Sequence, residues 1–534
     1  MKLLDLPYAS RRMPAVGRRG MVATSQPLAA LAGLAMLEAG GTAVDAAIAA
    51  AATLTVVEPT SNGIGGDAFA LVWDGKKLHG LNGSGRAPAA LDLAVLQAAG
   101  HSSVPTRGWL PVTVAGAPRA WHDLHSRFGR LDFERVLSPA ISAAEDGYAV
   151  TPTVAMYWNY AQRAFADLAD PATAAWHSTF LTRGNAPQAG DLWRSRRMAR
   201  TLRRIAQSGA DDFYTGELAA QIVRFANETG GFISAADLAG HTSTWVEPIS
   251  TNYRGYDVWE IPPNGQGLAA LIALNILEGY ELSRNPRDSV QAFHLQIEAM
   301  KLAFADAHRY IADPDHVAVP TEALLSKRYA ASRRALIGDT AQVRAAGELP
   351  HGGTVYLCVA DGDGMMVSYI QSNYMGFGSG VVVPDTGIAL QNRGAGFALD
   401  PTHPNVLAPG KRPFHTIIPS FLTRDGEAIG PFGVMGGAMQ PQGHVQMVVN
   451  MVDWFLNPQA SLDAPRWQFD AGLQVLLEYG VPQHVIEGLG ALGHQVRIQA
   501  EGGVFGRGQI IWRNDAGTFV GGSDMRADGC ALGI

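Results

Sequence analysis

The segment that decides the fold is His351-Gly352-Gly353-Thr354-Val355-Tyr356-Leu357-Cys358-Val359-Ala360-Asp361. A flexible, glycine-containing segment ends at Thr354, and a run of β-branched, aromatic and aliphatic residues follows directly. The turn Asp361-Gly362-Asp363-Gly364 then leads into a second strand-like run at 365–372. Two apolar runs joined by an Asp-Gly turn are typical of a β-hairpin, so the first strand is predicted to begin at Thr354.

A threonine at the start of a buried strand permits a particular kind of catalysis. If the chain is cut before Thr354, the new α-amine and the hydroxyl lie on the same residue. The amine can then accept the hydroxyl proton, and no separate histidine is needed to activate the nucleophile. The alternative interpretation is a strand-initial threonine after a flexible loop, and this stretch taken alone favours that alternative.

Composition sets limits on the remaining possibilities. The chain has 534 residues, too many for one ordinary core, so two or more packed units are expected. Hydrophobic residues make up 47% and charged residues 17%, which is a globular rather than a disordered or membrane-spanning composition. The net charge of −7, without a long basic block, argues against a nucleic-acid partner. The alanine-rich run at 43–57 is too short to span a bilayer and is predicted to be a buried helix.

Cysteine and histidine content gives no sign of a disulfide framework or a metal site. Cys358 and Cys530 are the two cysteines, and Cys358 is expected to be a core thiol. His122 and His125 share a predicted helix face, but no acidic or thiol partner lies at metal-site spacing. No metal and no cofactor are therefore expected. The N-terminal region has no continuous apolar core of signal-peptide length, which predicts a cytoplasmic protein.

The order of the predicted elements suggests a layered fold. Helices are predicted at 27–39, 42–57, 131–147, 193–208, 216–229, 289–312 and 442–454, and strands at 21–25, 68–73, 77–81, 253–261, 354–360, 366–372, 387–391, 417–423 and 428–434. Segment 338–353 is polar, lacks periodicity and is the best linker candidate. Helices followed by stacked strands indicate an α/β sandwich.

Two glycine-rich loops and one serine motif are further candidates for functional sites. Gly63-Ile64-Gly65-Gly66 follows a helix and precedes a strand, the reverse of a dinucleotide-binding loop. The loop at 82–88 holds Arg86, which is either solvated or a carboxylate clamp. Gly378-Ser379-Gly380 lacks the spacing of a nucleophile elbow, which disfavours a Ser-His-Asp hydrolase.

Seven short motifs, each weak alone, together carry a specific resemblance. They are Gly40-Gly41-Thr42-Ala43-Val44-Asp45-Ala46, Gly63-Ile64-Gly65-Gly66-Asp67, Gly353-Thr354, Lys411-Arg412-Pro413, Gly436-Gly437, Asp463-Ala464-Pro465-Arg466 and Ser523-Asp524-Met525-Arg526. In this order, and over nearly the whole length, the chain resembles the γ-glutamyltransferase family of N-terminal-nucleophile hydrolases.

The resemblance implies a precursor that cuts itself between Gly353 and Thr354. The products would be a large chain, 1–353, and a small chain, 354–534, which remain folded together. The implied fold is a four-layer αββα sandwich (α/β, or α+β) with a largely helical segment in the large chain. Thr354 would attack an amide carbonyl, form an acyl-enzyme and pass the acyl group to water or to an amine.

Three further residues match the family's catalytic positions. Gly436 and Gly437 resemble its oxyanion hole, and two glycines let backbone N–H groups approach a developing negative charge without side-chain obstruction. Ser372 matches the second hydroxyl, which hydrogen-bonds the nucleophile. The alternatives are a turn before the following helix for the glycines and a strand-end serine for Ser372.

The acyl-binding positions depart from the family pattern. Arg393 stands where the family has a neutral amide, and Gly396 stands where it has the carboxylate that binds a substrate α-amine. His415 and Thr416 replace the paired serines that grip the α-carboxylate, and Tyr374 replaces an asparagine. An ammonium group here would find no counter-ion and an adjacent like charge.

These departures predict a rebuilt acyl pocket. The family's carboxylate-binding arginine aligns with Ser84, and Arg86 is displaced by two positions. Arg393, with Arg86 as a second candidate, favours an acyl group that bears a free carboxylate but no α-amine, although either arginine could instead pair with a local carboxylate. The chain looks most like the amidohydrolase and acylase branch, such as oxamate amidohydrolase, and a small dicarboxylic monoamide is the expected substrate class.

Two other functions stay open on the sequence alone. One is an ordinary glutathione hydrolase or γ-glutamyltransferase with altered contacts. The other is a catalytically silent binding homologue that never matures. The expected partners are the small-molecule amide and the two chains of one precursor, with no nucleic acid and no membrane, and a homodimer is left open.

Overall fold

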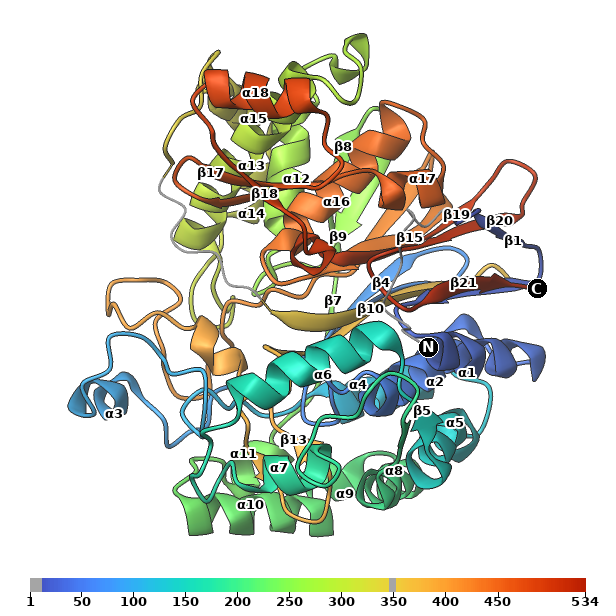
Figure 1. Cartoon of the computed structure of the whole chain (residues 1–534), viewed down its shortest axis with the longest axis vertical. Helices are drawn as coiled ribbons and strands as arrows, with labels where there is room; N and C mark the ends of the chain where they lie inside the picture. The colour runs from blue at the N-terminus through green and yellow to red at the C-terminus, as the bar shows by residue number, and fades with distance from the viewer. Residues whose placement is uncertain (1–11, 345–351) are drawn as a thin grey trace.

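The computed structural model describes residues 12–344 and 352–534. In these residues two seven-stranded sheets pack face to face, and helices cover the outer face of each (Figure 1). The predicted αββα sandwich is therefore confirmed. The first sheet has the order β21 (Cys530–Gly533), β2 (Gly20–Thr24), β10 (Gly353–Asp361), β11 (Met366–Tyr374), β3 (Asp67–Trp73), β4 (Leu78–Asn82) and β7 (Thr244–Val246).

The second sheet also mixes strands from the two ends of the chain. Its order is β1 (Ala15–Gly17), β20 (Phe519–Ser523), β19 (Arg507–Arg513), β15 (Glu427–Met435), β14 (Ser420–Arg424), β9 (Tyr256–Glu260) and β8 (Ile249–Tyr253). Neighbouring strands are antiparallel in both sheets. Smaller strands form separate pairs or a three-stranded sheet: β5 (Tyr148–Ala149), β6 (Leu192–Trp193), β12 (Val382–Val383), β13 (Ile388–Ala389), β16 (Trp467–Ala471), β17 (Gln474–Glu478) and β18 (Gln495–Gln499).

The helices form the two outer layers (Figure 1). On the side of the first sheet lie α1 (Pro27–Glu38), α2 (Ala43–Val57), α4 (Ala117–Phe128), α5 (Phe133–Asp146), α6 (Pro152–Ala164), α7 (Ala175–Phe180), α8 (Arg196–Ser208), α9 (Asp211–Tyr214), α10 (Glu217–Thr229) and α11 (Ala235–Ala239). On the side of the second lie α12 (Gly267–Leu277), α13 (Val290–Tyr310), α14 (Thr321–Leu325), α15 (Lys327–Arg334), α16 (Met439–Val452), α17 (Pro458–Asp463) and α18 (Gln483–Ala491). The short α3 (Leu93–Ala98) stands apart from both layers.

Helix α2 shows why an alanine-rich run is a core element here. Thr42 caps its N-terminus by accepting from the Asp45 amide, while the Asp45 carboxylate accepts from the Thr42 amide. Every residue of the helix is buried, because small side chains let α1, α5 and β10 approach it from different sides. Among the described residues no helix is long and apolar enough to cross a membrane.

Strand β10 is buried on both faces because it lies inside the sandwich. Val355, Leu357 and Val359 point into the core shared with α2, whereas Tyr356 and Cys358 belong to the core between the two sheets. The strand pairs with β2 on one side and β11 on the other. Cys358 is a buried free thiol, as predicted, and burial raises its pKa well above the usual range.

The structure corrects several predicted boundaries. The single strand predicted at 253–261 is a hairpin, β8 and β9, which turns at Arg254 and Gly255. Helix α16 begins at Met439, three residues earlier than predicted, because Pro441 falls in the first turn, where a helix tolerates proline. The strand predicted at 387–391 is reduced to the two residues of β13. Of the predicted linker, residues 345–351 lie outside the described residues.

Candidate active site

The predicted nucleophile lies at the start of β10, where the first sheet carries an irregularity. Thr354 is 1% exposed, and the register between β10 and β11 shifts between Gly353 and Val355. The Thr354 hydroxyl donates to Ser372 Oγ at 3.1 Å, and the Ser372 hydroxyl donates to the Gly353 carbonyl at 2.8 Å. Ser372 therefore connects the predicted nucleophile to the carbonyl of the bond that is predicted to break.

Arg393 completes the surroundings of Ser372. Its guanidinium donates to Ser372 Oγ at 3.2 Å and to Thr416 Oγ1 at 2.7 Å, and it lies 4.3 Å from the centre of the Tyr374 ring. The Tyr374 amide also donates to Ser372 Oγ, at 2.8 Å. The structure thus brings together five of the residues predicted from sequence: Thr354, Ser372, Tyr374, Arg393 and Thr416.

The Arg393 guanidinium is a buried cation with no salt bridge to the part of the chain that the structure describes. The side chain is 0% exposed, and no carboxylate of the described residues lies within ion-pair distance. Its Nε atom has no acceptor among the described groups. Burial lowers the pKa of Arg393 to about 10, so it stays charged near neutral pH. Since an unpaired buried charge is costly, the arrangement suits a bound anion.

Asp67 is a buried carboxylate on β3, the strand that pairs with β11, and its negative charge interacts with Arg393. His415 Nδ1 faces the Ile417 amide at 3.4 Å, which places the His415 proton on Nε2, 3.0 Å from Asp67 Oδ2. The other Asp67 oxygen accepts from the amides of Gly85 and Gly116 and from the side chain of Gln391. Burial raises the pKa of Asp67 to about 7, against the opposing effect of Arg393, and holds the pKa of His415 well below its usual value.

The predicted oxyanion hole occupies the turn between β15 and α16. Gly436 and Gly437 have φ angles of +132° and +61°, a region that side-chain-bearing residues rarely adopt. A Cβ atom at Gly436 would lie 3.1 Å from Gly506 Cα. Within the described residues, neither glycine amide donates a hydrogen bond. These two N–H groups are therefore free to receive a developing negative charge.

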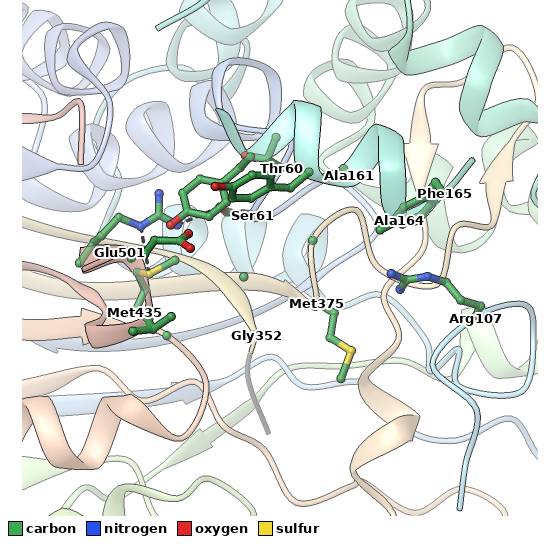
Figure 2. A pocket seen from close by; sticks show the side chains of 18 residues that line it. Thr60, Ser61, Arg107, Ala161, Ala164, Phe165, Gly352, Met375, Met435 and Glu501 are labelled. Carbon is green, nitrogen blue, oxygen red and sulfur yellow. Dashed lines mark hydrogen bonds between the residues drawn. The ribbon is translucent and has the colours of Figure 1, made fainter. Parts of the chain in front are cut away.

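A cavity of about 330 Å³ borders both the predicted scissile bond and this turn (Figure 2). Gly353 and Gly436 are part of its lining. The aromatic part of the wall comes from Tyr157, Tyr160 and Phe165, and charged side chains come from Arg107, Glu501 and Arg507. A substrate in this cavity would lie beside Gly353, the residue before Thr354, and beside Gly436, the first glycine of the turn.

Arg86 does not join this group. Its guanidinium contacts Asp313 at 3.2 Å and Asp315 at 2.6 Å. Arg86 is therefore paired with carboxylates of the protein, which is the alternative to a substrate-binding role. Arg393, by contrast, pairs with no carboxylate of the described residues. His415, predicted to contact substrate, instead contacts Asp67.

Comparison with known proteins identifies the family. The model of the gamma-glutamyltranspeptidase family matches residues 29–534. The chain belongs to this family. It is 36% identical over 531 residues to the "Glutathione hydrolase-like YwrD proenzyme" of Bacillus subtilis, covering 97% of this chain and 99% of the relative. It is 35% identical over 535 residues to the "Oxamate amidohydrolase proenzyme" of Klebsiella pneumoniae, with coverage of 97% and 99%.

Solved structures agree with this membership of the gamma-glutamyltranspeptidase family. The crystal structure of cephalosporin acylase from Bacillus halodurans superimposes with a TM-score of 0.96 at 54% identity, covering 99% of this chain and 98% of the other. The relatives are hydrolases and acylases that act on amide bonds, and this chain is an enzyme of the same kind.

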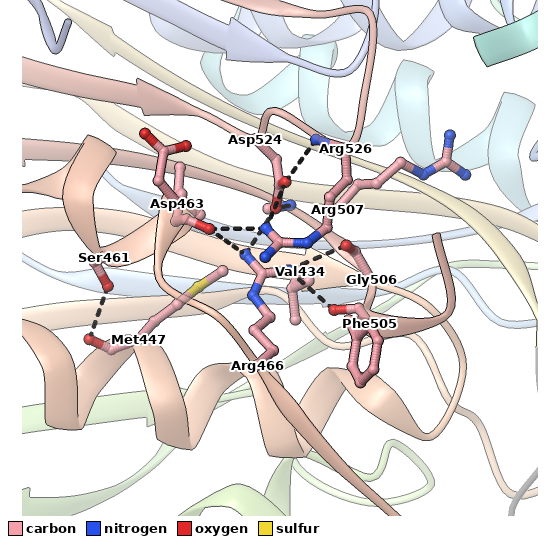
Figure 3. A network of polar contacts seen from close by, with 12 residues as sticks. Val434, Met447, Ser461, Asp463, Arg466, Phe505, Gly506, Arg507, Asp524 and Arg526 are labelled. Atoms are coloured by element: carbon pink, nitrogen blue, oxygen red, sulfur yellow. Dashed lines mark hydrogen bonds and ion pairs between the residues drawn. The ribbon is translucent and has the colours of Figure 1, made fainter. Parts of the chain in front are cut away.

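Two sequence motifs that carried the family resemblance meet in one buried network (Figure 3). Asp524 accepts from Arg466 at 2.7 Å and from Arg526 at 2.9 Å. Although burial acts to raise it, the two arginines hold the pKa of Asp524 at about 2. Arg466 also donates to the carbonyls of Phe505 and Gly506, at 2.9 and 3.0 Å. Because Gly506 packs against Gly436, these family motifs support the double-glycine turn.

Asp67, Arg107, Glu501 and Arg507 are charged residues near the site that the sequence did not predict as site residues. In the sequence Asp67 is only the end of a glycine motif, because its influence on Arg393 depends on the strand pairing that places it opposite Ser372. Arg107 is a lone arginine in an irregular loop, and no local pattern distinguishes it from a solvated one. A buried acidic residue directly after a glycine loop was the one signal available for Asp67.

Proposed function

We propose that this chain is a self-processing amidohydrolase that hydrolyses a small amide with a free carboxylate on its acyl half. The observation that carries the proposal is the buried Arg393, which has no described carboxylate partner and donates to Ser372 beside Thr354. A substrate carboxylate would supply the missing counter-charge. Oxamate-like and glutaryl-amide-like compounds have this chemistry.

In the uncut chain, the α-amine of Thr354 is part of a peptide bond and cannot act as the base. Ser372 Oγ accepts from the Thr354 hydroxyl and donates to the Gly353 carbonyl, so it would take the Thr354 proton while it passes its own proton to that carbonyl oxygen. Thr354 Oγ1 would bond to the Gly353 carbonyl carbon, the carbon–nitrogen bond would break, and the nitrogen would take up the proton. Water would then hydrolyse the ester, leaving a Gly353 carboxylate and a free Thr354 amine.

Turnover would repeat this chemistry on a substrate. The free amine of Thr354 would accept the hydroxyl proton while Oγ1 attacks the amide carbonyl. The amides of Gly436 and Gly437 would stabilise the oxyanion. The amine half of the substrate would leave with the proton, and water would cleave the acyl ester to release a carboxylic acid and restore Thr354.

Selectivity for the acyl half would come from charge. A γ-glutamyl group carries an α-ammonium, which would lie near Arg393 without a counter-ion, since Gly396 replaces the family's carboxylate. A glutaryl group has the same length but no ammonium. The names of two relatives, an oxamate amidohydrolase and a cephalosporin acylase, support an acyl preference other than γ-glutamyl.

The first test is intact-mass measurement with N-terminal sequencing, which should find a fragment that starts Thr-Val-Tyr-Leu. The second compares glutaryl-p-nitroanilide with γ-glutamyl-p-nitroanilide, which differ only in the α-ammonium. We expect kcat/KM to favour the glutaryl compound by at least about ten-fold, or 1.4 kcal/mol. Comparable rates would support the glutathione-hydrolase alternative, and uncut, inactive protein would support the silent homologue.

The matched variants are Thr354→Ala and Thr340→Ala. The first should stay full-length and inactive, because it lacks the hydroxyl that attacks in both reactions. The second removes a hydroxyl from the exposed segment before the cut and should mature and turn over normally. Normal processing of Thr354→Ala would refute the proposed chemistry.

A further inference from the structure

The cavity beside the predicted scissile bond has a composition that the acyl half of the substrate does not explain. Its volume of about 330 Å³ is at the lower end of the range for small-molecule sites, about 300–1,000 Å³. Tyr157, Tyr160 and Phe165, from α6 and the residue that ends it, form an aromatic wall in which the Tyr157 and Tyr160 rings meet at 83°. Tyr160 is 40% exposed, unusually high for a large aromatic side chain in this chain. Arg393 does not line this cavity.

Arg107 brings an uncommitted positive charge to one end of the cavity (Figure 2). Its Nη1 donates to the Gly378 and Thr106 carbonyls, at 2.9 and 3.4 Å, and the guanidinium lies 4.2 Å from the centre of the Phe165 ring. Its Nε and Nη2 groups donate to no described residue, and no described carboxylate lies within ion-pair distance. Burial lowers its pKa, but a guanidinium stays protonated.

The other arginine in the cavity is already engaged. Arg507 pairs with Glu58 at 3.2 Å, donates to Ser61 at 3.3 Å and lies 4.8 Å from the centre of the Tyr157 ring. Glu501 lies at the end of the cavity opposite Arg107 (Figure 2). An anion in the cavity is therefore drawn toward Arg107 and repelled from Glu501.

We infer that this cavity binds the amine half of the substrate, and that this half is an aromatic or fused-ring amine with an anionic substituent that Arg107 recognises. The inference rests on the proposed amidohydrolase function and adds the second half of the substrate to it. The aromatic wall provides stacked and edge-on contacts for a ring, and the free Nε and Nη2 donors match a carboxylate. Arg393 then binds the acyl half of the substrate and Arg107 binds the amine half, on the other side of the amide bond.

The test uses two glutaryl amides with the same acyl half, one of aniline and one of 3-aminobenzoate. The mature wild-type enzyme should hydrolyse the 3-aminobenzoate amide with a kcat/KM about ten-fold higher, mainly through a lower KM, because only this amide gains charge-assisted hydrogen bonds from Arg107. Arg107→Met should remove this preference, because it should lower kcat/KM for the 3-aminobenzoate amide far more than for the anilide. Arg107→Lys should restore part of it.

Arg163→Met is the matched control. Arg163 also stacks on an aromatic side chain of α6, 4.9 Å from the centre of the Tyr160 ring, but it does not line the cavity. This variant should keep the full preference. Equal wild-type rates on the two amides, or an equal loss on both in Arg107→Met, would refute the role of Arg107.

A second measurement decides the question if Arg107→Met does not mature. On the wild-type enzyme, 3-aminobenzoate should inhibit anilide hydrolysis competitively and aniline should not; equal inhibition by the two amines would overturn the inference. Failure of the wild type to hydrolyse either amide would instead count against the proposed function, so the two failures are distinguishable.

Discussion

At the scale of single residues, replacement of Arg393 should weaken substrate binding without lowering thermal stability. Arg393→Met should raise KM for a glutaryl amide by about ten- to a hundred-fold, because it removes a charged hydrogen-bond donor of about 1.5–3 kcal/mol. Hydrolysis of the matching pentanoyl amide, which lacks the carboxylate, should change little. Because the arginine is buried without a paired carboxylate, the thermal midpoint should not fall. A large loss of thermal stability would show that Arg393 has a structural role instead.

Titration of Asp67 should make substrate binding depend on pH. Burial raises its pKa to about 7, so at pH 8 it is charged and partly offsets Arg393, whereas at pH 6 it is neutral and Arg393 acts alone. KM for a glutaryl amide should therefore rise as pH increases through about 7. The free energy of unfolding should also fall as pH rises. The raised pKa of Asp67 stabilises the fold in acid, and this contribution is lost as pH rises through about 7.

The measurement is KM between pH 5.5 and 8.5 for the glutaryl and pentanoyl amides. Asp67→Asn should flatten the glutaryl profile, and the pentanoyl profile should lack this step in either protein. A step near pH 7 that survives in Asp67→Asn belongs to another group, for which the α-amine of Thr354 is the first candidate.

At the scale of elements, the β15–α16 turn connects sequence motifs to catalysis. Gly436→Ala would place a Cβ 3.1 Å from Gly506 Cα, at a φ of +132° that alanine rarely adopts. Moving one oxyanion donor should lower kcat by about 10²–10³-fold. Gly410→Ala is the control, since its φ is +67° but its Cβ would meet no atom within 4 Å. Loss of activity in both variants would indicate general backbone strain rather than a displaced donor.

Much of this fold could be predicted because local patterns dominate it. The Asp-Gly turn after β10 and the alanine-rich run of α2 predicted their elements well, since turn chemistry and an apolar run are local signals. The site was harder. Arg393 and Arg86 look alike in sequence, yet Arg393 is buried with no carboxylate partner among the described residues, whereas Arg86 pairs with Asp313 and Asp315, more than two hundred residues away. Such pairing depends on tertiary contacts that no local pattern contains.

At the scale of the whole molecule, the proposed cut would produce two chains that cannot fold apart. In the first sheet β2, from the large chain, lies between β21 and β10, from the small chain. In the second, β1, β8 and β9 of the large chain flank four strands of the small chain. Neither chain contains a complete sheet, so both should elute together in gel filtration and separate only in denaturant.

This interleaving predicts how unfolding depends on protein concentration. Unfolding of the cut enzyme releases two chains, so its denaturation midpoint should rise when the protein concentration rises, by mass action. The uncut Thr354→Ala precursor releases one chain, and its midpoint should stay constant over the same range. Circular dichroism in guanidinium chloride, at protein concentrations that differ by a hundred-fold, would measure both. A midpoint of the cut enzyme that does not move with concentration, or chains that separate without denaturant, would contradict the interleaved assembly.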